Sequence, residues 1–162
     1  MTRVTDLIDK AVAAEFEKPN VRKNGFEQSV LAKQIWREFD EDEQFSVGYP
    51  HLIRMINKSA KKLMKSALEK YRTAEFQLPF DLDGAMSIPD GEVWKIRVTE
   101  SLSMEEWDKA LADRLSQYEA DGRVLKERQT ADRLMKPYWR QHPGWNVGKC
   151  LRQIVNDASK KR

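Results

Sequence analysis

The sequence has little cysteine, little histidine and no long apolar stretch. Cys150 is the only cysteine, so no disulfide can form within the chain and a reducing compartment is expected. No apolar run approaches the roughly 18 residues that a membrane-spanning helix needs. The first ten residues, MTRVTDLIDK, lack the apolar centre of a signal peptide. We therefore expect a cytoplasmic protein with no membrane partner.

Patterns typical of catalysis and metal binding are also scarce. His51, His142 and Cys150 are scattered along the chain, which argues against a zinc site or a paired nucleophile and base. No glycine-rich phosphate loop, G-x-S-x-G or H-E-x-x-H occurs. These absences predict a protein that is not an enzyme and uses no cofactor and no metal.

Two short segments imitate known sites incompletely. Residues 81–84, DLDG, are similar to the start of a haloacid-dehalogenase phosphatase, but Pro79 interrupts the strand that should carry the nucleophile. Residues 40–44 copy the first ligands of a calcium loop, but Phe45 and His51 stand where a glycine and the last glutamate are required. Neither segment supports the chemistry it imitates.

Charge is abundant and unevenly distributed. Of the 162 residues, 40% are apolar and 34% are charged, so the chain can bury a core. The net charge is only +3. Residues 49–75 nevertheless hold 7 cations and 2 carboxylates, and residues 137–162 hold 6 and 1. Such segregation creates local fields that favour an anionic partner.

The segment Tyr49–Arg72 predicts one long helix, opened by Pro50. At about 100° per residue its cations fall on one stripe and its apolar residues on the opposite side. The stripe consists of Arg54, Lys58, Lys61, Lys65 and Arg72, with Lys62 and Lys70 at its edges. Like charges at i,i+4 spacing destabilise a helix by a few tenths of a kcal/mol per pair. The chain accepts this cost repeatedly, which suggests that the stripe has a function.

Two helices are predicted before this segment. The first spans residues 5–17, with Thr5 as its cap, and is followed by a loop over 20–25. The second spans residues 26–39 and ends in the acidic run Asp40–Glu43. The helix dipole disfavours anions at that end, so the run either breaks the helix or pairs with the basic stripe.

A β-hairpin and further helices are predicted after it. Residues 85–88 and 93–98 flank Pro89-Asp90-Gly91, which is strong turn chemistry. Residues 103–106 form a capping box for a long helix that reaches about Lys136, where Pro137 ends it. Gly122 weakens its middle, and pairing within the chain or in a homodimer are both open. A turn over residues 138–144 and a short helix capped by Asn146 complete the chain.

The fold class that follows is α+β, mostly α. N-terminal helices and one β-hairpin occur in the order of a winged helix, and a long helix and a short C-terminal helix follow. We expect two domains, residues 1–100 and 101–162.

The leading functional hypothesis is a non-enzymatic regulatory protein that binds nucleic acid, most simply DNA, through the basic helix. The acidic hairpin tip, Asp90 and Glu92, argues against it, and the alternative is a solvated or protein-contacting face. The predicted nucleic-acid-binding residues are His51, Arg54, Asn57, Lys58, Lys61, Lys62, Lys65 and Arg72.

A second hypothesis is a protein-binding inhibitor or adaptor that blocks a host complex. Its docking surface would be the hairpin or the aromatic turn. That turn carries Trp139, His142, Trp145 and Lys149. Exposed, these side chains could form a hot spot; buried, the tryptophans would pack the last helix onto the body.

Part of the sequence also resembles a known group of proteins. The segments Tyr71-Arg72, Gln77-Leu78-Pro79-Phe80 and Ile88-Pro89, with the charged helix after them, resemble small bacteriophage and prophage proteins. The resemblance implies a small regulatory or host-directed role and indicates no functional residues.

Overall fold

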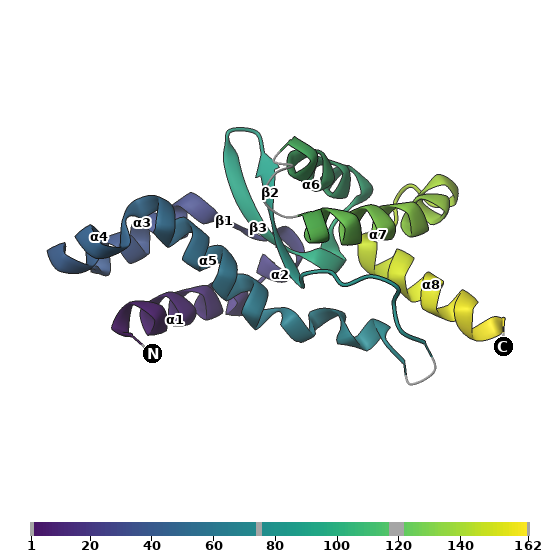
Figure 1. Ribbon diagram of the computed structural model, residues 1–162, viewed down its shortest axis with the longest axis horizontal. Helices are drawn as coiled ribbons and strands as arrows, with labels where there is room; N and C mark the ends of the chain where they lie inside the picture. Colours follow the sequence, from purple (N-terminus) through teal and green to yellow (C-terminus); the bar gives the residue numbers. More distant parts are fainter. Residues whose placement is uncertain (1, 74–75, 117–121, 162) are drawn as a thin grey trace. The chain divides into compact units, whose positions relative to one another are not determined.

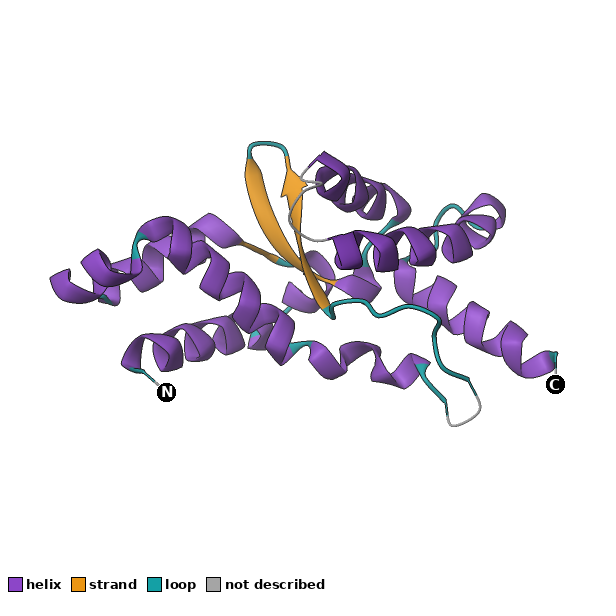
Figure 2. Ribbon diagram, in the orientation of Figure 1, coloured by secondary structure: helices purple, strands orange, loops and turns teal. Residues whose placement is uncertain are grey.

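The computed structural model describes residues 2–73, 76–116 and 122–161, and the chain forms two compact units. Unit 1 comprises Met1–Met64 and Ala85–Val98, and unit 2 comprises Lys65–Gly84 and Thr99–Arg162. The protein is mostly helical with one small antiparallel sheet, which confirms the predicted fold class (Figure 2). The predicted division between residues 100 and 101 differs from these units over residues 65–84 and 99–100, which belong to unit 2.

Unit 1 contains five helices and the three-stranded sheet within its described residues. The helices are α1 (Arg3–Glu17), α2 (Val21–Asn24), α3 (Gln28–Glu38), α4 (Glu41–Val47) and α5 (Tyr49–Leu63) (Figure 1). Helix α1 begins earlier than predicted, because Thr2 and not Thr5 is its cap: the Thr2 hydroxyl accepts a hydrogen bond from the Thr5 amide. The predicted loop over 20–25 contains the single turn α2.

The sheet consists of β1 (Phe26–Glu27), β2 (Ala85–Asp90) and β3 (Val93–Val98), in the order β1-β3-β2. The predicted hairpin is therefore confirmed. Strand β1 was predicted as the start of a helix, which is wrong: Phe26 pairs with Ile96 across the sheet. The elements of unit 1 follow one another in the order α1, α2, β1, α3, α4, α5 and the hairpin β2–β3, and β1 lies beside β3.

One apolar core holds unit 1 together. Helix α5 packs against α1 and α3, and α3 packs against β3. Phe16 and Phe26 meet edge to face, with ring centroids 5.4 Å apart. The core includes Ile8, Val12, Phe16, Leu31, Ile35, Leu52, Ile56, Ile96 and Val98. Burial on this scale fixes which side of α5 faces inward.

The prediction that the acidic run lies at a helix C-terminus is wrong. Asp40 is the N-cap of α4 and forms a capping box with Glu43, so the carboxylates occupy the first turn. The helix dipole favours anions there, which is the physical reason for the correction. Helix α4 continues to Val47, and α5 begins at Tyr49.

The predicted single helix Tyr49–Arg72 is wrong beyond Leu63. Helix α5 ends there, and the 3₁₀ helix η1 (Lys65–Tyr71) follows. Leu68 and Tyr71 are buried and belong to unit 2, whereas the buried residues of α5 belong to the core of unit 1. The change of helical period accompanies this change of core. Pro50 lies in the first turn of α5, as predicted.

Unit 2 contains η1, η2 (Thr99–Ser101), α6 (Met104–Ser116), α7 (Gly122–Gln141) and α8 (Val147–Lys160). The predicted capping box is confirmed, with Glu106 N–H donating to Ser103 Oγ at 3.2 Å and Ser103 N–H donating to Glu106 Oε2 at 2.9 Å. The long helix predicted after this capping box is in fact two helices, α6 and α7, which pack on each other within the chain (Figure 1).

Pro137 does not end α7, which continues to Gln141. The proline removes one backbone hydrogen bond, but the next turn is held by packing and by side chains. Trp139 is buried against Trp107, with ring centroids 6.4 Å apart, and the Trp107 indole donates to Asp132. Tyr138 donates to Asp157 of α8 at 2.8 Å. These contacts outweigh one lost hydrogen bond.

Helix α8 follows the sequence pattern closely. Asn146 caps it by accepting from the Lys149 amide at 2.9 Å. Its inward side is buried and consists of Val147, Cys150, Leu151, Ile154 and Val155. Among the described residues, no helix has the length and apolarity to cross a membrane.

Candidate functional site

Helix α5 presents two different faces. Leu52, Ile56 and Ala60 are at most 1% exposed, because they fill the core beside α1 and α3. The large hydrophobic contrast between the two sides leaves the cations of α5 outside the core. The sequence-predicted amphipathic arrangement is therefore present over the length of α5.

A groove of about 370 Å³ lies between α1 and α5. Three of its residues come from α1 and six from α5, so unit 1 supplies the whole groove. The lining residues are Thr5, Ile8, Asp9, His51, Arg54, Met55, Lys58, Ser59 and Lys62. Cationic side chains surround a single carboxylate, which gives the groove an excess of positive charge.

The carboxylate, Asp9, is tied to α5. Ser59 donates its hydroxyl to Asp9 Oδ1 at 2.6 Å, and Lys62 Nζ lies 3.3 Å from Asp9 Oδ2. The hydrogen bond from Ser59, and then the ion pair with Lys62, hold the pKa of Asp9 below its ordinary value of 3.8 against the opposing effect of burial. Asp9 is therefore ionised at neutral pH and neutralises Lys62 in part.

Arg54 and Lys58 are the two cations of the groove that could contact an anionic partner. Both are exposed and both line the groove one helical turn apart. In the described part of the chain neither forms an ion pair with a carboxylate. His51, another turn earlier, is exposed on the same rim. Two unneutralised cations and a histidine thus follow one edge of the groove.

The other predicted nucleic-acid-binding residues are placed differently. Asn57 accepts a hydrogen bond from Gln28 at 2.6 Å and so joins α5 to α3. Lys61 is half-buried. Lys65 lies beyond α5 in η1, and Arg72 is engaged by Glu69 and Asp81 at 3.5 and 3.1 Å. The predicted continuous stripe is therefore wrong, because α5 ends before its last members.

The acidic run contacts a different cation from those of α5. Arg3 Nη1 lies 2.5 Å from Glu43 Oε1 and 3.5 Å from Asp40 Oδ2. Glu41 and Asp42 are exposed on α4. Within the described residues, the ion pairs of this run join α4 to α1, and they leave Arg54 and Lys58 uncovered.

The aromatic turn is divided between core and surface. Trp139 is 1% exposed, and its indole donates to the Trp145 carbonyl at 2.8 Å. This burial favours the packing role over a docking role for Trp139. His142 is exposed and stacks on half-buried Trp145 at 4.0 Å, while Lys149 is exposed at the start of α8. A flat aromatic pair and a lysine remain at the surface.

Two features were missed by sequence reasoning. Asp9 and Ser59 join α1 to α5, and no local pattern signals that a carboxylate 50 residues away lies beside a serine. Phe45 is 94% exposed on α4, the most exposed large apolar side chain among the described residues. Its position after four acidic residues was a signal that it would not enter a core.

Comparison of the chain with protein-family models, with curated proteins and with solved structures found no match. The resemblance to phage proteins therefore stays a prediction. The described residues contain no group of three or more histidine, cysteine, aspartate or glutamate side chains placed to hold a metal ion.

Proposed function

We propose that this protein is a non-enzymatic regulator that binds DNA through the outer face of α5. The observation that supports this most directly is the pair Arg54 and Lys58, which are exposed at the rim of a groove and have no carboxylate partner among the described residues. Cations in such an arrangement neutralise phosphates and release counterions, which drives association with a nucleic acid.

The order of elements in unit 1 is consistent with this role. In winged-helix domains the third helix enters the major groove, and α5 is the third helix of unit 1 when the short helices α2 and α4 are left out. The acidic hairpin tip opposes phosphate less than its sequence suggests, because Asp90 Oδ2 lies 2.6 Å from Lys95 Nζ. Glu92 still faces water there.

The composition of the face predicts how the protein would recognise DNA. Lysine contacts phosphate as a point charge, whereas arginine forms paired hydrogen bonds with guanine. Arg54 is the only arginine of α5. We therefore expect binding dominated by phosphate contacts, with modest discrimination between base sequences.

Fluorescence anisotropy on random-sequence duplex DNA over a salt series tests the proposal. The wild-type chain should bind at low salt and lose affinity steeply as salt rises. Replacing Arg54→Gln together with Lys58→Gln should weaken binding and make the log–log salt slope shallower by about 1.8, since each phosphate contact contributes roughly 0.9.

The matched control replaces Lys10→Gln together with Lys33→Gln. These two lysines are exposed in unit 1, do not line the groove, and change the net charge equally. The control should keep most of the affinity and the slope. Equal weakening by both double variants would show that only net charge matters, and absent binding at low salt would refute the proposal.

A second function, docking on another protein as an inhibitor or adaptor, is favoured by the exposure of Phe45. A phenylalanine that is 94% exposed is the kind of side chain that anchors a protein interface. If a stoichiometric host protein binds the wild-type chain and Phe45→Ala abolishes that binding without affecting DNA binding, the docking role is supported. Either activity is proposed to operate in the cytoplasm, as the single cysteine suggests.

A further inference from the structure

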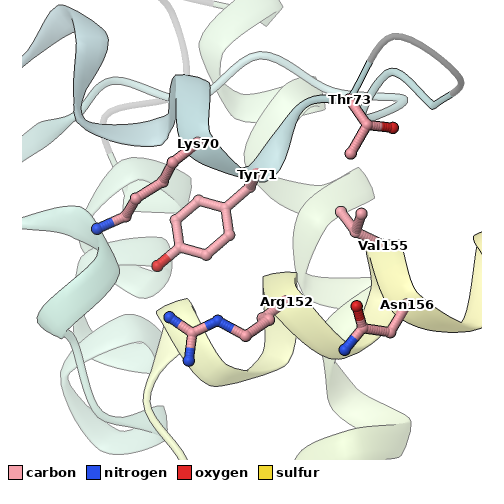
Figure 3. A pocket seen from close by; sticks show the side chains of 6 residues that line it. All are labelled: Lys70, Tyr71, Thr73, Arg152, Val155 and Asn156. Atoms are coloured by element: carbon pink, nitrogen blue, oxygen red, sulfur yellow. The ribbon is translucent and has the colours of Figure 1, made fainter.

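Unit 2 contains a pocket of its own, of about 360 Å³. One side comes from the end of η1 and the residues after it, and the other from one face of α8 (Figure 3). The lining residues are Lys70, Tyr71, Thr73, Arg152, Val155 and Asn156. The volume lies at the lower end of the range typical of small-molecule sites.

The polar side chains of the pocket are mainly hydrogen-bond donors. Arg152 and Asn156 lie one turn apart on α8 and flank Val155, which supplies an apolar wall. Figure 3 shows the Arg152 guanidinium beneath the hydroxyl end of the Tyr71 ring, with the Asn156 amide beside Val155. Thr73 lies on the opposite side with its methyl group toward Val155, while its hydroxyl accepts a hydrogen bond from the Phe76 amide at 2.9 Å. Among the described residues, no carboxylate lines the pocket.

Two of the charges near the pocket cancel, and one remains. Glu100 Oε2 accepts from the Tyr71 hydroxyl at 2.5 Å and lies 2.7 Å from Lys70 Nζ. Burial, and then the hydrogen bond to Glu100, raise the pKa of Tyr71, so the phenol stays neutral. Arg152 is exposed and, within the described residues, has no carboxylate partner. The pocket therefore carries one uncompensated guanidinium.

We propose that this pocket binds a small ligand with a phosphate group, of about the size of a nucleoside monophosphate. Arg152 would hold the phosphate, because its planar fork matches two oxygens of that group. Asn156 adds a neutral donor, and Val155 would contact the rest of the ligand. The proposal is independent of DNA binding by α5, since every lining residue belongs to unit 2.

The test measures binding of adenosine monophosphate, inorganic phosphate and adenosine to the full chain by isothermal titration calorimetry. The DNA-binding double variant, Arg54→Gln with Lys58→Gln, removes the other cationic site and should bind adenosine monophosphate as the wild type does. Arg152→Gln should weaken binding tenfold or more, since a charge-assisted, two-pronged hydrogen bond is lost. The affinity of Arg152→Lys for adenosine monophosphate should lie between those of the wild type and Arg152→Gln.

Lys149→Gln is the matched control, because Lys149 is an exposed cation on α8 that does not line the pocket. It should leave binding unchanged, and the melting temperature of each variant reports whether unit 2 is intact. Equal affinities for phosphate and adenosine monophosphate would support the site and narrow its ligand to the phosphate group. Three results would overturn the proposal: no binding up to about 10 mM, unchanged binding by Arg152→Gln, or adenosine binding as tightly as its monophosphate.

Discussion

The substitution Asp9→Asn separates stability from binding in unit 1. Asp9 connects α1 to α5 by accepting from Ser59 at 2.6 Å and pairing with Lys62 at 3.3 Å. It also contributes the one negative charge of the groove. The amide keeps the shape of the side chain and can still accept the hydrogen bond from Ser59. The variant therefore removes charge and little else.

The cost in stability follows from these two contacts. A hydrogen bond to a charged acceptor contributes roughly 1 kcal/mol more than a neutral one. The pair with Lys62 adds less, roughly 0.3 kcal/mol, because Lys62 is exposed and solvent screens it. The free energy of unfolding should fall by about 1.3 kcal/mol, which lowers the melting temperature of a chain this size by about 3–5 °C.

The effect on DNA should have the opposite sign. Removing one negative charge about 10 Å from a phosphate gains roughly 0.4 kcal/mol per phosphate in water. Two or three phosphates near the groove give about 1 kcal/mol, or roughly fivefold tighter binding at low salt. The variant also frees Lys62 to contact DNA. A less stable protein should therefore bind more tightly.

Urea denaturation and DNA anisotropy on the same preparations measure both quantities. Glu17→Gln is the control, because Glu17 is an exposed carboxylate on α1 that does not line the groove. It should change affinity much less than Asp9→Asn. If Asp9→Asn loses stability without gaining affinity, DNA does not occupy this groove. An unchanged stability would show that the contacts of Asp9 contribute nothing.

The stability difference should depend on pH. The pKa of Asp9 is lowered in the folded protein from 3.8, so its stabilising contribution is complete above about pH 4. It is lost as pH falls through the folded-state pKa. Wild type and Asp9→Asn should therefore differ most at neutral pH, and the difference should shrink as pH falls through the lowered folded-state pKa of Asp9, as urea denaturation at several pH values can determine.

Three further substitutions test the fold, each by urea denaturation. Gly25→Ala should lower the free energy of unfolding by at least about 2 kcal/mol more than Gly48→Ala does. Both glycines have positive φ, 72° and 69°, so the backbone strain is similar in the two variants. Only at Gly25 would the added Cβ collide with the Ile96 carbonyl oxygen. Similar costs would refute the close approach of this loop to β3. Gly148→Ala should cost about 1–3 kcal/mol, because its Cβ would lie 2.7 Å from the Tyr71 hydroxyl oxygen; a neutral effect would mean that Tyr71 moves freely. Asp40→Ala should cost about 1 kcal/mol by removing the cap of α4, and no loss would show that α4 does not need it.

Elements with local signals were predictable from the sequence. The hairpin follows from turn residues between two β-forming runs, and the caps at Ser103 and Asn146 follow from side-chain chemistry within one turn. Helix α4 had such a signal too, because Asp40 and Glu43 have the spacing of a capping box, but the acidic run was interpreted either as a helix breaker or as a partner of the basic stripe. Strand β1 had no local signal, since Phe26 pairs with a residue 70 positions later.

The candidate site was predictable only in part, for the same reason. Helical periodicity placed Arg54 and Lys58 on the outer face of α5. It could not show that Asn57 is used by Gln28. It could not place Asp9 beside Ser59 either, because that contact depends on how two distant helices pack. Nor could it place the end of α5, where the chain passes from one core to the other.

The interrupted course of unit 1 has a consequence for how the chain is made. A ribosome synthesises residues 1–64 before Ala85–Val98, so β1 is made before the strand that it pairs with. The pairing of Phe26 with Ile96 can form only after the hairpin has been synthesised. Shortening the gene at any single codon before the hairpin therefore yields a fragment without its sheet, and a free-standing unit 1 would require a new linker from Met64 to Ala85.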